Sequence, residues 1–380
     1  MNQLFPELPL FLSSSPGDTS DRLSIDELRE SSRQLRSIDD FPVEIIRRCA
    51  RLENRFSSDP QSLIRYYVWL AFGCLTSAFI MTQRNSAIRR IESSNNEAAR
   101  ERLLTPIGSG QWFATVGISQ LSTSRRHVAQ PPLVARPTES GWLLDGYCPW
   151  VTGAAHADII VIGAIAQSLE NEQSIRGDSE IFDSINSQML FAIPTNRPNI
   201  ACSPGMSLLG LSASCTDVVR LNGVAVTTND LLHGPCANVM HATRSTNAGP
   251  TGASGAGGLQ TSALAIGHAA KAIEFLSLQA ANRPELRATA EKWMRNWESQ
   301  FNLLLQFASG RATGDVVLFR KGANDLVLQA TQSALAAAKG AGFVDDHDVG
   351  RWCCEALFFL VWSCPQAVID AHLCSLAEVG

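Results

Sequence analysis

The side chains best able to bind metals or to activate a substrate are unevenly spread along this chain of 380 residues. Ten cysteines are present, but they form no C-x-x-C pair and no other spacing typical of metal ligands. No aspartate or glutamate occurs from Leu231 to Ile273, or between Glu355 and Asp370. We therefore expect neither a metal site nor a disulfide framework, and this cysteine usage favours a reducing cytoplasm.

A glycine-rich stretch over residues 247–259 is a second candidate for chemistry. It lacks the G-x-G-x-x-G pattern of dinucleotide-binding loops, because Gln260 follows Leu259, and no strand–helix–strand pattern surrounds it. The stretch could cradle a phosphate. A flexible segment that leads into a helix is the simpler interpretation, and the one we favour.

The elements that position these residues change character along the chain. Residues 1–110 have helical patterns, with a capping box at Ser24 to Glu27. Residues 111–232 contain short apolar runs between turn signals, which predict a β sandwich or barrel. The expected helices are 41–52 and 62–90, then 259–281, 285–309, 323–338 and 348–376. The expected strands are 112–118, 142–150, 159–166, 189–193 and 218–221, with a solvated loop over 167–188.

The composition excludes several classes of protein. With 45% hydrophobic residues the chain can bury a large core, and its 18% charged residues fall below the usual share of about 25%, which favours contact between subunits. A net charge of −5 without a basic stripe argues against nucleic acid as a partner. The first residues lack a basic segment followed by a long apolar one, so we expect no export signal. The longest apolar stretch, over 66–81, is shorter than the ~20 residues of a membrane span.

The run GWLLDGYCPWVTGAAHAD, from Gly141 to Asp158, resembles the segment G-y-x-l-n-G-x-K-x-W-I-T-n-a-x-x-A-d of the acyl-CoA dehydrogenase family. The resemblance extends at low similarity over most of residues 60–376. It implies FAD as the cofactor, bound in part by Trp150, Val151 and Thr152. Trp150 would stack near the flavin ring, and Thr152 would hydrogen-bond to the N5/O4 edge of that ring. A flat apolar wall and a nearby hydroxyl suit a flavin. The alternative makes Trp150 an ordinary residue of the barrel core.

The same resemblance implies an α+β, acyl-CoA dehydrogenase-like fold in three domains. These are an N-terminal helical domain over 1–110, a middle β-barrel domain over 111–234 and a C-terminal four-helix bundle over 235–380. It also implies a homodimer or homotetramer.

Two further runs in the β region support the resemblance. The run from Trp112 to Ser124 takes the place of the family's a-x-T-E-P-x-a-G-S-D segment, without its Glu-Pro and Ser-Asp pairs. There Ile118, Ser119 and Ser124 would bind flavin or a thioester through backbone amides and hydroxyls. A plain strand and turn explains the run equally well. Residues 208–232 resemble the segment that closes the family's β domain, and they bear mainly on the fold.

Two short segments among the C-terminal helices complete the resemblance. Arg283 falls where the family has an arginine that reaches the FAD pyrophosphate of a neighbouring subunit, although a helix-end pair with Glu285 is the alternative. Lys339, Gly340 and Gly342 lie in a run that resembles the family's turn against the nucleotide part of FAD. The glycines would permit a close backbone approach there, and a simple helix C-cap would explain them as well.

The catalytic base of the family is missing. Dehydrogenation of an acyl thioester needs a base for its α-proton, and the family uses a glutamate shortly after its R-D-A segment. Alignment on Glu355 puts Ser363 in that place, and the family's alternative base position falls on Gly257 or Gly258. A serine without an activating partner cannot take this proton. The catalytic residues therefore remain unassigned, with four histidines as candidates by location only: 233, 241, 268 and 347.

Three functions remain open. The one we prefer is an FAD-dependent oxidoreductase that acts on an acyl thioester or a related small organic substrate and passes electrons to a flavoprotein acceptor. A second is a flavin-dependent monooxygenase, as in family branches that lack the glutamate, which would need a flavin reductase. A third is a catalytically silent binding or assembly subunit.

Overall fold

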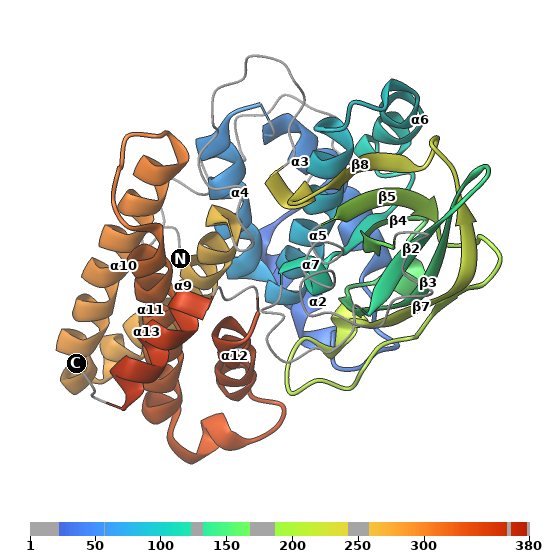
Figure 1. Cartoon of the computed structure of the whole chain (residues 1–380). Helices are drawn as coiled ribbons and strands as arrows, with labels where there is room; N and C mark the ends of the chain where they lie inside the picture. The colour runs from blue at the N-terminus through green and yellow to red at the C-terminus, as the bar shows by residue number, and fades with distance from the viewer. Residues whose placement is uncertain are drawn as a thin grey trace.

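The computed structural model describes residues 23–56, 58–122, 132–167, 187–241, 258–362 and 366–377. Helices come first, a sheet follows, and helices complete the chain, which confirms the order expected from the sequence (Figure 1). Most of the glycine-rich stretch, most of the expected loop over 167–188, Ser124 and Ser363 lie outside the described residues.

The helices before the sheet are α2 (Ile25–Gln34), α3 (Val43–Phe56), α4 (Pro60–Gly73), α5 (Leu75–Glu92) and α6 (Glu97–Gly108). The predicted capping box is confirmed, because the Glu27 amide donates to the Ser24 hydroxyl at 3.1 Å and the Ser24 amide donates to the Glu27 carboxylate at 2.7 Å. The single helix expected over 62–90 is wrong. The chain leaves the helical conformation at Cys74, which has φ −146° and ψ 111° and serves as the N-cap of α5.

The strands form one mixed sheet in the order β6-β7-β3-β2-β4-β5-β8, with β1 paired in parallel to β4. Their bounds are β1 (Ala114–Gly117), β2 (Leu133–Thr138), β3 (Gly141–Val151), β4 (Ile159–Ala166), β5 (Gln188–Pro194), β6 (Ile200–Cys202), β7 (Asp217–Val226) and β8 (Leu231–Cys236). The sequence patterns missed three of them. β2 and β8 contain prolines that resemble turn signals, and β6 is too short to show a periodicity.

The sheet curls around its own core. The rings of Trp142 on β3 and Phe191 on β5 lie 5.7 Å apart, although two strands separate β3 from β5 in the sheet order. In a flat sheet these strands would be about 14 Å apart. The enclosed core takes side chains from β2, β3, β4, β5 and β7, while α5 and α6 cover the outer face of the sheet around β1 and β4.

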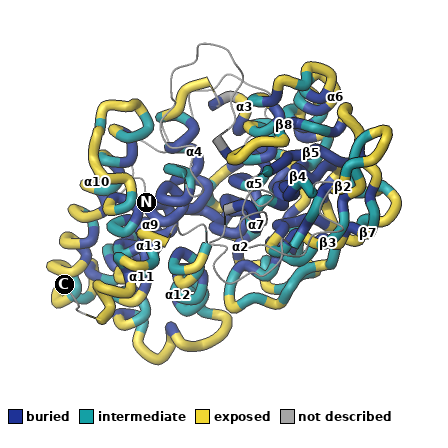
Figure 2. Tube along the Cα trace, in the orientation of Figure 1, coloured by how far each residue is buried: buried dark blue, intermediate teal, exposed yellow. Residues whose placement is uncertain are grey.

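The helices after the sheet are α9 (Leu259–Asn282), α10 (Arg287–Ala308), α11 (Val316–Ala338), α12 (Asp348–Leu357) and α13 (Gln366–Leu376). The helix expected over 348–376 is therefore wrong as a single element, because a 3-10 turn at Phe358–Leu360 follows α12. Helix α9 is buried over most of its length and packs against α4, α10 and α11 (Figure 2). No helix in the described ranges combines the length and the apolarity needed to cross a membrane.

Helices α4 and α9 cross at Gly267. A Cβ atom at this position would lie 2.2 Å from the carbonyl oxygen of Val68 and 2.9 Å from the Cβ of Ala71. The crossing therefore depends on the absence of a side chain, since a backbone carbonyl cannot swing away as a side chain can.

We expect Gly267→Ala to lower the free energy of unfolding by about 1–3 kcal/mol, because the clash with Val68 outweighs the better helix propensity of alanine. Urea unfolding measures this change. Gly340→Ala is the matched control, since a Cβ there meets nothing within 4 Å, and its effect should stay within about 0.5 kcal/mol. Equal stability of the two variants would contradict the close crossing.

Candidate cofactor-binding site

Trp150 lies at the end of β3 with its side chain in solvent. Its backbone is left-handed, with φ +58°, and the residue is 59% exposed, whereas Val151 beside it is fully buried. The pairing with β7 is irregular here, because Cys148 faces Val219 while Val151 faces Asp217. This bulge places two residues of β3 opposite one of β7 and turns the indole outward. Trp150 is thus not part of the barrel core, and the indole presents a flat apolar surface.

Thr152 lies behind this surface and is 2% exposed. Its hydroxyl lies 3.0 Å from that of Thr216, which in turn lies 2.8 Å from that of Ser214. The hydroxyl of Thr115 donates to the Thr152 carbonyl at 2.7 Å. The Thr152 hydroxyl is therefore enclosed in a chain of buried hydroxyls, and in this structure it faces Thr216 instead of the surface.

Ile118 and Ser119 lie beside the end of β3. Ser119 begins the short helix α7 (Ser119–Ser122), and its hydroxyl donates to the carbonyl of Pro149 at 2.8 Å. Because Pro149 precedes Trp150, this bond ties α7 to the bulge. Ile118 and Ser119 are both half-buried. The structure thus brings together Ile118, Ser119 and Trp150, as the predicted site requires.

A second group of predicted residues meets where α9 and α11 end. Arg283 donates to the carbonyl of Ala337 at 2.6 Å and pairs with Glu285 at 3.1 Å, so the helix-end pair offered as an alternative is present. Lys339 caps α11 with φ +55°. It begins the 3-10 turn Lys339–Phe343. This group presents two cationic side chains at one end of the helices.

The two glycines of this turn have different surroundings. A Cβ at Gly342 would lie 2.7 Å from that of Ala338, and a Cβ at Gly350 would lie 2.6 Å from the Gly342 carbonyl oxygen. Gly342 thus allows the turn to pack closely against α11 and α12. A Cβ at Gly340 would meet nothing within 4 Å, so packing within the chain does not require a glycine there.

The residues that could hold FAD fit it in part. The exposed indole of Trp150 has no aromatic neighbour among the described residues, so one of its faces can accept a planar ring. Arg283 and Lys339 suit a pyrophosphate by charge. The Thr152 hydroxyl does not fit a contact with flavin in this conformation, because it is hydrogen-bonded to the Thr216 hydroxyl. No cluster of described residues could hold a metal ion.

An aromatic cluster precedes the position of the missing base. The rings of Phe358 and Trp362 stack 5.1 Å apart, and both meet the ring of Phe79 edge-on, at 4.8 and 4.9 Å. Ser363 follows Trp362 directly. Glu355 is buried with Arg351 at 3.8 Å and His268 at 3.7 Å, so its carboxylate serves the packing of α12 against α9.

The histidines considered as bases make contacts away from Trp150. His233 lies 3.0 Å from the Ser93 hydroxyl, and burial lowers its pKa. His268 is fully buried against the Trp352 carbonyl, and burial lowers its pKa well below the usual value. His347 is the N-cap of α12, where its ring accepts a hydrogen bond from the Val349 amide. The side chain of His241 lies outside the described residues.

The opposite environments of Trp150 and Val151 lead to a stability test. We expect Val151→Ala to lower the free energy of unfolding by about 2 kcal/mol, because it opens a cavity in the core. Trp150→Ala should change it by no more than about 0.5 kcal/mol, since the indole is exposed. Chemical denaturation of both variants measures this difference, and a larger loss for Trp150→Ala would show that the indole serves the fold.

Comparison with known proteins gives the fold a name. No protein-family model and no curated protein sequence matches the chain. A solved glutaryl-coenzyme A dehydrogenase in complex with glutaryl-CoA is similar with a TM-score of 0.71 and 16% identity, over 94% of this chain and 96% of that one. Butyryl-CoA dehydrogenase from Megasphaera elsdenii is similar with a TM-score of 0.68 and 15% identity, over 100% of this chain and 99% of that one. The structure of an FAD complex of PigA is similar with a TM-score of 0.69 and 13% identity, over 94% of this chain and 99% of that one. The chain therefore has the acyl-CoA dehydrogenase-like fold.

Proposed function

We propose that this protein is an FAD-dependent oxidoreductase that acts on an acyl thioester or a related small organic substrate. The observation that carries the proposal is the exposed indole of Trp150 at the bulge of β3, with Ser119 bonded beside it. An exposed tryptophan in a left-handed conformation contributes little to the core, and such local strain is typical of functional sites. The fold shared with a dehydrogenase complexed with glutaryl-CoA and with an FAD complex supports the same assignment.

FAD, when bound, would supply the hydride acceptor. Trp150 would stack on the flavin ring, and Ile118 and Ser119 would border it. The Thr152 hydroxyl could reach the ring by rotating away from Thr216, whose own hydroxyl would keep its bond to Ser214. A rotation of this kind exchanges one hydrogen bond for another at little net cost.

The pyrophosphate would be held by Arg283 and Lys339 of a second copy of the chain. Within one chain these cations lie at the ends of helices, whereas Trp150 lies on the sheet. A site shared between two copies accounts for both groups, and it requires a homodimer or a homotetramer. The low share of charged residues agrees with extensive subunit contact.

A flavin-dependent monooxygenase is the second candidate, and the missing base favours it. The sequence between Glu355 and Asp370 contains no acid, so no carboxylate flanks Ser363 along the chain. The candidate histidines 233, 268 and 347 make contacts elsewhere. A reaction of reduced flavin with oxygen needs no base for an α-proton. This candidate requires a flavin reductase as partner, whereas a dehydrogenase would pass its electrons to an acceptor flavoprotein.

The first test is retention of flavin. Trp150→Ala should weaken FAD binding by about tenfold through loss of stacking, and Arg283→Ala should weaken it as well. The absorption spectrum of each purified variant gives the flavin occupancy. Tyr147→Ala is the matched control, because Tyr147 is an exposed aromatic on the same strand. Unchanged occupancy in both test variants would remove the assignment, and a colourless wild-type protein would favour a binding or assembly subunit.

The second test restores the base. Ser363→Glu should create or raise acyl-CoA oxidation, because it returns a carboxylate to the position that the family uses. Anaerobic titration with a panel of acyl-CoAs, followed as bleaching of the flavin spectrum, measures the gain. No gain in a folded, flavin-loaded variant contradicts the alignment at Ser363. Reoxidation of the reduced wild type by air with a hydroxylated product would identify the monooxygenase instead.

A further inference from the structure

A cleft of about 170 Å³ lies between α2, α9 and α12, and it includes none of the residues predicted to bind FAD. One wall is apolar and consists of Phe275, Leu278 and Trp352. The remaining lining is mostly charged. A space of this size admits a small molecule with a few heavy atoms.

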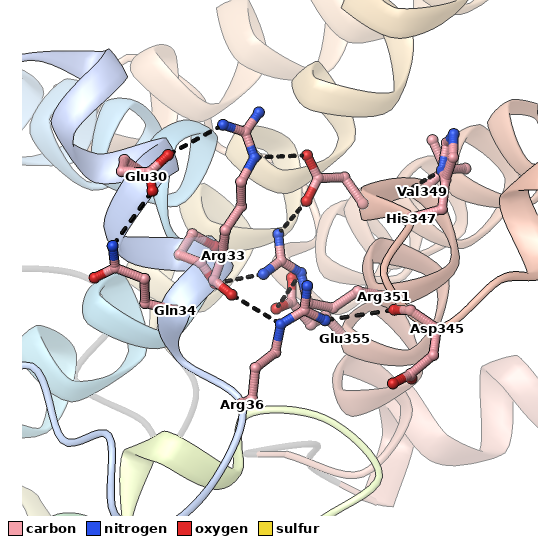
Figure 3. A network of polar contacts seen from close by, with 11 residues as sticks. Glu30, Arg33, Gln34, Arg36, Asp345, His347, Val349, Arg351 and Glu355 are labelled. Atoms are coloured by element: carbon pink, nitrogen blue, oxygen red, sulfur yellow. Dashed lines mark hydrogen bonds and ion pairs between the residues drawn. The ribbon is translucent and has the colours of Figure 1, made fainter.

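The arginines around the cleft already have carboxylate partners. Arg33 pairs with Asp348 at 3.1 Å, and Arg351 pairs with the same aspartate at 2.9 Å (Figure 3). Arg29 pairs with Glu274 and also lies over the ring of Phe72. These pairs join α2 to α9 and α12, so the arginines serve to hold the walls of the cleft together.

Lys271 lines the cleft and has no such partner. It is 3% exposed, and its Nζ atom makes no hydrogen bond to any described residue. Burial lowers its pKa to about 8, against the opposing attraction of Glu355, while Arg351 and Arg29 lower it further. A buried ammonium without a hydrogen-bond acceptor is costly, which indicates that an acceptor is supplied from outside the chain.

Other unpartnered atoms gather around Lys271. Arg351 Nε and Glu355 Oε2 are buried without hydrogen bonds, although they belong to ion pairs. His268 Nε2 faces the Trp352 carbonyl and is therefore the donor, which leaves its Nδ1 as a buried lone pair. Of the residues that carry these atoms, Lys271 and Arg351 line the cleft, whereas His268 and Glu355 do not.

The charges of the cleft select the kind of ligand. Four cations surround it, namely Arg29, Arg33, Lys271 and Arg351. Three of them are paired with carboxylates. Arg29 pairs with Glu274. Arg33 pairs with Glu30 and Asp348, and Arg351 pairs with Asp348 and Glu355. His268 adds no charge, because burial keeps it neutral. Lys271 alone among these four cations makes no ion pair with a described residue, and a single unpaired ammonium matches a monoanion better than a divalent phosphate.

We propose that this cleft binds a small organic monocarboxylate, with its carboxylate on the ammonium of Lys271 and its hydrocarbon part against Phe275, Leu278 and Trp352. The carboxylate supplies the acceptor that the Lys271 ammonium lacks, and the apolar wall accepts a short alkyl group. This site is separate from the proposed flavin site and goes beyond the proposed oxidoreductase function.

Isothermal titration calorimetry with butyrate tests the proposal, with butyramide as a neutral probe of the same shape and inorganic phosphate as a second anion. Butyrate should bind, and butyramide and phosphate should bind at least about tenfold more weakly. Lys271→Met should weaken butyrate binding by about tenfold or more, whereas Lys292→Met, on the exposed face of α10, should leave it unchanged. No binding of butyrate, or equal binding of butyramide, would overturn the proposal and leave water as the partner of Lys271.

A second pair of variants avoids the buried position. Leu278 is 51% exposed at the cleft, so substitution there should not disturb folding. Leu278→Asp should weaken butyrate binding by repulsion, and Leu278→Asn, of the same shape without the charge, should weaken it less. Binding that survives both Lys271→Met and Leu278→Asp belongs to another site, such as the proposed thioester site, and this result would also overturn the proposal.

Discussion

The close contact between α4 and α9 at Gly267 is the constraint on which the rest of the molecule depends. It joins helices from the two ends of the chain into one core that runs from α2 to α12. Because two backbones meet there without an intervening side chain, the crossing fixes the position of α9. Helix α9 in turn carries Lys271 at the charged cleft and leads directly into Arg283 at the end of the helices.

The sheet has an apolar core of its own, and the exposed Trp150 lies outside that core. Its curl brings five strands onto a common apolar core, which buries Val151 completely. One bulge turns the side chain of Trp150, the residue directly before Val151, into solvent. The strand thus presents a flat apolar surface to solvent, and an indole face of this kind can stack on a planar ring.

Charge is handled differently at two places in the molecule. The residues that precede Ser363 in the sequence include Phe358 and Trp362, whose rings stack on each other. The nearest acid before them, Glu355, is held in the interior by Arg351 and His268. In the cleft between α2, α9 and α12, by contrast, several cations line the surface. One of them, Lys271, has no hydrogen-bond acceptor among the described residues. Burial raises the pKa of a carboxyl group and lowers the pKa of an ammonium group, and partners of opposite charge counteract both shifts.

The sequence by itself determined the order of helices and strands, the capping box at Ser24 and the lack of a carboxylate near Ser363, because each of these depends on residues close together in the chain. Only the tertiary structure decided that Trp150 is exposed while Val151 is buried, since an alternating pattern is broken by a bulge that the pairing with β7 creates. It also decided the break at Cys74 and the cleft around Lys271. Those features depend on which helices meet, and contacts between α2, α9 and α12 leave no periodic signal in the sequence.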